Sequence, residues 1–67
     1  MHYVIAAKNE ITGSGKLWYY NRLDGWTSSL EDAKLFMTKI TGRIALKRML
    51  IENDYVGFSF CVIEKKS

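Results

Sequence analysis

Alternating apolar and polar positions predict strands near both ends of the chain. Residues 2–7 place alternate side chains on opposite faces of an extended segment, and residues 16–21 repeat the pattern. The glycines within residues 9–15 can form the loop between these strands, which we expect to pair as an antiparallel hairpin. Residues 55–64 predict a third strand with one apolar face, formed by Val56, Phe58, Phe60 and Val62.

The middle of the chain carries turn and helix signals instead. The dipeptide Asp24-Gly25 predicts a turn. Ser28 and Ser29 each precede an acid by three residues, which is the spacing of a capping box, and they predict a helix over residues 30–37. Thr38 can cap a second helix that runs to residue 52.

These elements follow the order β-β-α-α-β along 67 residues. We expect a single α+β domain (1–67), in which a small three-stranded antiparallel sheet carries two helices on one face. A chain of this length buries only about 60% of the surface that its unfolded form exposes, so its stability is marginal. Small domains often gain stability by self-association, so both a monomer and a homodimer remain open.

Cysteine and histidine are too few for the usual devices that stabilise small domains. Cys61 has no cysteine partner, and Cys61 with His2 does not make a four-ligand zinc site. We therefore expect no metal and no cofactor. A single unpaired cysteine suits a reducing compartment, and no segment approaches the ~18 apolar residues of a membrane span, so we expect a cytoplasmic protein without a membrane partner.

Catalytic constellations are also missing from the sequence. Nothing places an acid beside His2, and the sequence predicts no base or helix N-terminus beside Cys61 that would make its thiol reactive. The stretch from Gly13 to Lys16 is similar to a phosphate-binding loop, but a predicted strand follows it where such a loop needs a helix. These observations favour a binding protein over an enzyme.

The second predicted helix has more apolar positions than one sheet contact requires. One side of its helical wheel holds Ile40, Ile44 and Ile51, and another holds Ala45, Leu46, Met49 and Leu50. Either the first helix covers the additional side, or that side faces a partner or a second copy. Gly42 costs about 1 kcal/mol relative to alanine inside a helix, so a break with Thr41 as the cap is an alternative.

Two groups of side chains are candidates for binding. Between Ala33 and Ile51 the chain has five bases and no acid, which indicates either a solvated helix face or a phosphate-contacting surface. Alternation places Trp18 and Tyr20 on one strand face, and Trp26 follows nearby. These rings are candidates for the core, for a protein interface or for base stacking.

Several segments of the chain resemble small accessory proteins of tailed bacteriophages. The resemblance is carried by Tyr3-Val4-Ile5, Trp18-Tyr19-Tyr20, Gly25-Trp26-Thr27, and the run from Leu30 to Phe36 with Thr38 following. It implies a short protein that binds and modulates or inhibits a host protein, such as a polymerase, nuclease, toxin or defence effector. No functional residue is carried over from the resemblance.

Two functions follow as hypotheses. The first is a host-protein modulator that acts by occlusion, and the second is a small nucleic-acid-binding domain that uses the basic helix face. The expected partner-binding residues are Trp18, Tyr20, Trp26, Arg43, Lys47, Arg48 and Met49.

Overall fold

The structure is a computed structural model that describes residues 1–11, 15–21, 25–53 and 56–65. Strands β1 (His2–Asn9), β2 (Leu17–Asn21), β3 (Gly25–Thr27) and β4 (Phe58–Lys65) form an antiparallel sheet in the order β3-β2-β1-β4. Between β3 and β4 the chain forms a 3-10 turn, η1 (Leu30–Asp32), and the helix α1 (Lys39–Glu52). The α+β class is confirmed, but the sheet has four strands rather than three, with one α-helix rather than two in the described residues.

Strand β1 is the centre of the sheet and supplies most of the core. It forms the expected hairpin with β2 and pairs with β4 along its whole length. Alternate residues of a strand point to opposite faces, yet four consecutive residues of β1 are buried: Val4, Ile5, Ala6 and Ala7. Both faces of β1 are therefore covered, and the molecule has three layers.

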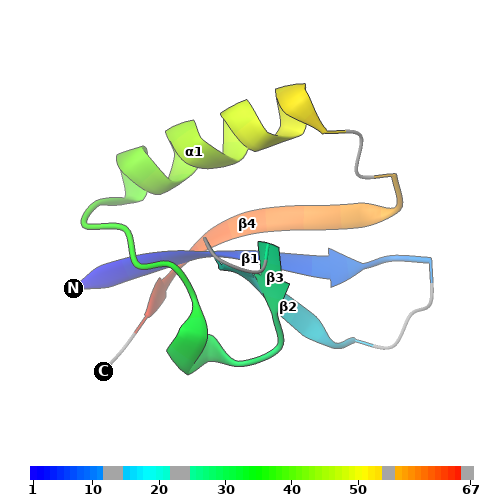
Figure 1. Cartoon of the computed structure of the whole chain (residues 1–67), viewed down its shortest axis with the longest axis horizontal. Coiled ribbons are helices and arrows are strands. Elements are labelled where there is room, and N and C mark those ends of the chain that lie inside the picture. The colour runs from blue at the N-terminus through cyan, green and yellow to red at the C-terminus, as the bar shows by residue number, and fades with distance from the viewer. Residues whose placement is uncertain (12–14, 22–24, 54–55, 66–67) are drawn as a thin grey trace.

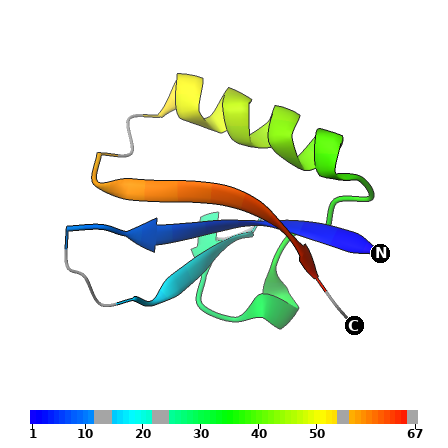
Figure 2. The ribbon, with the colours of Figure 1, turned by 180° about the vertical axis from the view of Figure 1, so that it is seen from behind.

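The two covering layers are α1 and the segment around η1, on opposite sides of the sheet (Figures 1 and 2). Gly42 of α1 lies against Val62, so Val62 points toward the helix. Lys65 lies three residues further along β4 and points to the other face, where its Nζ is 3.6 Å from Glu31 Oε2 of η1. The expectation that both helical segments share one face of the sheet is therefore wrong.

The predicted helix over residues 30–37 is also wrong. Ser29 is at the N-cap position, but its side chain makes no capping hydrogen bond, and Ala33 is already extended. Beyond it the Lys34 N–H donates to the Tyr20 carbonyl (2.8 Å), and Phe36 and Tyr3 exchange two backbone bonds of 2.8 Å. The Phe36 bonds use the part of β1 that β2 leaves unpaired, and the Lys34 bond uses β2, so long-range backbone pairing outweighs the local helix signal.

The second predicted helix is confirmed as α1, with Thr38 as its cap. The Thr41 N–H donates to Thr38 Oγ1 (3.2 Å), and the Thr38 N–H donates to Thr41 Oγ1 (3.4 Å), which completes a reciprocal capping box. Thr41 therefore lies in the first turn, and the alternative with Thr41 as the cap is wrong. At the other end, the Asn53 N–H donates to the Met49 carbonyl (3.0 Å).

The sequence pattern missed β3, the short edge strand that follows the predicted turn. Gly25 pairs with Asn21 and Trp26 pairs with Tyr20, so β3 pairs with β2, and Asp24 of the predicted turn lies outside the described residues, as do residues 22–23. Residues 12–14 of the predicted loop and residues 54–55 of the predicted third strand also lie outside them. That strand begins later than predicted, at Phe58, and Val56 belongs to the preceding turn.

Candidate binding surface

Helix α1 has two apolar sides, and only one of them contacts the sheet. Gly42 is buried, and Ala45, Leu46 and Met49 are half-buried. At about 100° per residue, Ile40, Ile44 and Ile51 fall within about 40° of one another on the opposite side of the helix. We call these three residues the isoleucine stripe.

The isoleucine stripe is uncovered within the described part of the chain. The exposed fractions of its side chains are 69% for Ile40, 58% for Ile44 and 77% for Ile51. The explanation that another helix of the chain covers this side is wrong, because η1 lies on the far side of the sheet (Figure 1). Met37, which is 74% exposed, adds a further apolar side chain just before the helix.

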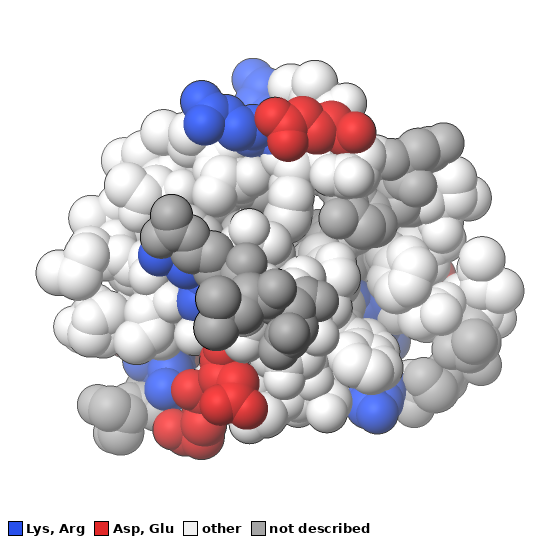
Figure 3. Space-filling view, in the orientation of Figure 1, with Lys and Arg blue, Asp and Glu red and all other residues white. Residues whose placement is uncertain are grey.

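Basic side chains flank the isoleucine stripe. Arg43, Lys47 and Arg48 are all exposed, and basic atoms lie over α1 along the upper rim of the molecule, with acidic atoms beside them (Figure 3). The single ion pair found among the described residues joins Lys65 and Glu31, so no carboxylate is within ion-pair distance of these three bases there. The three residues predicted to bind through positive charge therefore share one open surface.

The charged residues at the two ends of α1 are unfavourably placed with respect to the helix dipole. Lys39 lies in the first turn, where the positive end of the helix dipole repels a base, and the first turn contains no acid. Glu52, the acid of this helix, is its last residue, beside the negative end of the dipole. The helix dipole therefore does not account for Arg43, Lys47 and Arg48, because none of them lies in the last turn.

Met49 shares a surface with Arg48 but not with Arg43 and Lys47. It is half-buried and lines a hollow of about 310 Å³ between α1 and the sheet, together with Tyr20, Ile44, Arg48 and Glu52. Tyr20 and Met49, two of the predicted binding residues, thus line the same hollow where the helix rests on the sheet. Both are half-buried, so they contribute to packing as well as to the outer surface.

The predicted aromatic residues share the face of the sheet that carries α1. Trp18 pairs with Ala7, which in turn pairs with Phe60, and Tyr20 pairs with Trp26; directly paired residues point to the same face. The Trp26 ring lies 5.9 Å from that of Tyr20, in an edge-on arrangement, and 5.8 Å from that of Phe60. Trp26 therefore links the aromatic side chains of β2 and β4.

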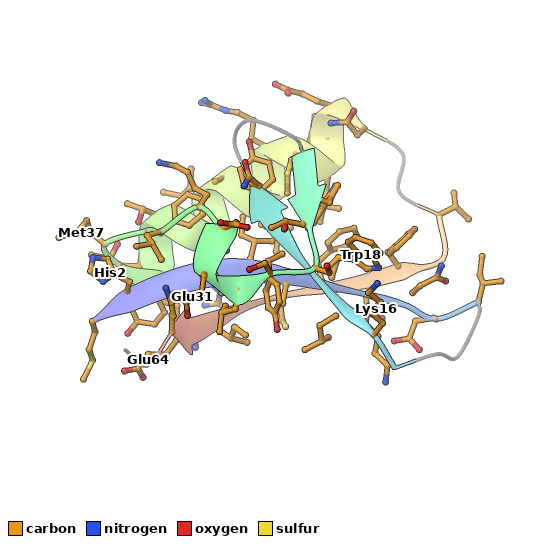
Figure 4. All side chains as sticks on the ribbon, turned by 60° about the horizontal axis from the view of Figure 1, so that its bottom comes forward. His2, Lys16, Trp18, Glu31, Met37 and Glu64 are labelled. Atoms are coloured by element: carbon orange, nitrogen blue, oxygen red, sulfur yellow. The ribbon has the colours of Figure 1, made fainter. Side chains whose placement is uncertain are left out.

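Beside α1, this face has an apolar hollow of about 470 Å³. The described residues that line it are Ala7, Asn9, Trp18, Trp26, Phe58 and Phe60. The Lys16 ammonium lies 4.4 Å from the Trp18 ring, at the end of the molecule far from His2 (Figure 4). Trp18 and Trp26 are thus brought together with two phenylalanines that our list of binding residues omitted, although their alternation in the last strand was visible.

The two residues considered for catalysis are kept apart. His2 pairs with Lys65 and Cys61 pairs with Ala6, so the two side chains lie four residue pairs apart along the sheet, about 13 Å at 3.3 Å per residue. Cys61 is exposed. Within the described residues, no three His, Cys, Asp or Glu side chains come together as a metal site.

Comparisons with protein families, with curated proteins and with solved structures found no match to this chain. No helix of the described residues is long and apolar enough to cross a membrane. The two candidate binding surfaces of the described residues are therefore the outer face of α1 and the aromatic hollow of the sheet.

Proposed function

We propose that this protein is a small non-catalytic binding protein that captures a partner protein through the outer face of α1 and thereby modulates or inhibits it. The single observation that carries this proposal is the uncovered isoleucine stripe, with Ile40, Ile44 and Ile51 each more than half exposed. Leaving three large aliphatic side chains of one helix side in water forgoes their burial, and exposed apolar patches often mark contact sites. The host-directed role implied by the phage-type resemblance is part of the same proposal.

The alternative function, nucleic-acid binding, draws on the same helix. Arg43, Lys47 and Arg48 are exposed, and no carboxylate of the described residues is within ion-pair distance of them, so their charges are available to phosphates. A phosphate backbone offers nothing apolar to the isoleucines that lie among these bases, however, whereas a protein partner can use both. The protein partner is therefore the better fit to α1.

Capture from a bacterial lysate tests the proposal. The immobilised protein, its Ile44→Glu variant and its Val56→Glu variant are compared by mass spectrometry of the retained proteins. Val56 is the matched control, because it is 71% exposed and lies outside α1, in the turn before β4. We expect the wild type and Val56→Glu to retain the same partner and Ile44→Glu to lose it.

A partner retained equally by all three proteins contradicts the assignment to the stripe. Nuclease treatment of the lysate, and a binding assay with duplex DNA at about 50 mM salt, distinguish protein binding from nucleic-acid binding. Steeply salt-dependent binding that survives Ile44→Glu but not Arg43→Glu with Lys47→Glu would favour nucleic acid instead.

A further inference from the structure

We infer that the partner segment that docks on α1 is an acidic amphipathic helix carrying a carboxylate that faces Lys47. This inference rests on the proposed function and adds the chemistry of the partner. It depends on the spacing of the stripe, on the place of Lys47 within it and on the charges that flank it.

The stripe has the spacing of a helix-packing seam. Ile40 and Ile44 are four residues apart, Lys47 follows after three, and Ile51 follows after four more. Alternating steps of four and three residues keep side chains on the line along which two helices pack. This line is about 17 Å long at 1.5 Å per residue, which matches three turns of a partner helix.

The alternative forms of a protein partner fit this surface less well. The backbone groups in the middle of a helix are bonded within the helix, so an extended segment finds no hydrogen bonds on α1 as it would at a sheet edge. A second copy packed along the same line would bring Arg43, Lys47 and Arg48 of both molecules together. Like charges oppose that pairing, whereas acids on a partner helix complement all three bases.

The position of Lys47 favours a partner helix over a lipid surface as the molecule that binds the stripe. It occupies a seam position between Ile44 and Ile51 and is exposed. An anionic membrane suits bases that flank an apolar face, but a lysine on the apolar line would have to enter the apolar layer with the isoleucines. Between two helices, a single charged seam position opposite an acid instead fixes the register of the pair.

Charge exchange between the protein and designed peptides tests the inference. The probes are synthetic amphipathic helices of about 15 residues with leucine at three seam positions and glutamate at a central one. Two such peptides, with glutamate at the second or third seam position, cover both helix directions, and each has a twin with lysine in its place. Fluorescence anisotropy measures binding to the full chain.

We expect one glutamate peptide to bind at least about tenfold more tightly than its lysine twin, because a close interfacial charge pair is replaced by a repulsive one. Lys47→Glu should reverse this preference. Lys8→Glu is the matched control, because it makes the same charge change at an exposed residue of β1 and should leave the preference intact. Circular dichroism checks that both variants retain the fold.

Equal affinity for the two twins, a preference that survives Lys47→Glu, or no binding at about 1 mM peptide would overturn the inference. So would co-sedimentation with phosphatidylglycerol vesicles that is lost in Ile44→Glu, because the occupant is then a lipid surface. If lysate capture depends on Ile44 while the glutamate and lysine peptides bind equally, the proposed function is retained and the acidic partner helix is rejected. If neither lysate capture nor peptide binding depends on the stripe, both the proposed function and the acidic partner helix are rejected.

Discussion

Gly42 of α1 lies against Val62 of β4, and a β-carbon at residue 42 would stand 3.0 Å from Val62 Cγ1 and 3.7 Å from Phe36 Cγ. A glycine inside a helix costs about 1 kcal/mol relative to alanine. Here the missing side chain lets the helix backbone approach the sheet closely. The contact fixes which side of α1 faces inward, and so leaves the isoleucine stripe outside.

A large side chain at residue 42 should therefore destabilise the fold. We expect Gly42→Leu to lower the free energy of unfolding by about 1–3 kcal/mol, because the added atoms enter a filled contact. Urea unfolding followed by circular dichroism measures the change. Ile44→Leu on the opposite side of α1 is the control, and it should change stability by less than about 0.5 kcal/mol. An unchanged midpoint for Gly42→Leu would show that the helix is not seated at this residue.

Gly57 should tolerate a side chain even less well than Gly25. Both have a positive φ, +85° and +87°, which costs a residue with a side chain about 1–2 kcal/mol. A β-carbon at Gly57 would also collide with the Ile11 side chain, whereas one at Gly25 would meet nothing within 4 Å. Urea unfolding should show a larger loss for Gly57→Ala, and adding Ile11→Ala should remove the difference. Equal losses for the two single variants would contradict the contact.

The capping box of α1 gives a third prediction. Thr38→Ala removes the oxygen that accepts the Thr41 N–H, and we expect it to lower the free energy of unfolding by about 1 kcal/mol. Thr38→Ser keeps an acceptor and should retain most of the stability. Thermal unfolding of the three proteins measures this order. Equal losses for alanine and serine would mean that the threonine methyl group, rather than the cap, is what matters.

The sequence predicts what local chemistry decides. The alternation of residues 2–7 and 16–21 and the capping signal at Thr38 are short-range features, and the first hairpin and α1 follow from them. The failure at residues 30–37 has the opposite cause. There, Phe36 completes its backbone bonds with Tyr3, thirty-three positions earlier in the chain, and no local pattern encodes that pairing.

The sequence likewise predicts one part of the binding surface and not another. The helical wheel separates the isoleucine stripe from the other apolar side of α1, because the period of a helix is fixed. Which side faces the sheet depends on the approach of Gly42 to Val62, and this requires the tertiary structure. That Met49 and Tyr20 line the same hollow likewise depends on where the helix crosses the sheet.

The two tryptophans should differ in their contribution to stability, which separates packing from binding on the aromatic face. Both tryptophans line the open hollow, but Trp26 also has ring contacts with Tyr20 and Phe60 and lies in the three-residue edge strand β3. We expect Trp26→Ala to lower the free energy of unfolding by about 3 kcal/mol, near the lower end for a large aromatic removed from a core.

Trp18→Ala should cost at least about 1 kcal/mol less, because the ring of Trp18 lies beside the exposed Lys16 ammonium rather than between two other rings. Urea unfolding of both variants and of the wild type measures the difference. Trp26→Phe serves as the control, because it keeps a ring between Tyr20 and Phe60 and should recover part of the loss. Equal losses in the free energy of unfolding for the two alanine variants would mean that the aromatic face serves packing alone. Among the predicted partner-binding residues, those on α1 would then be the ones left as candidates for binding a partner.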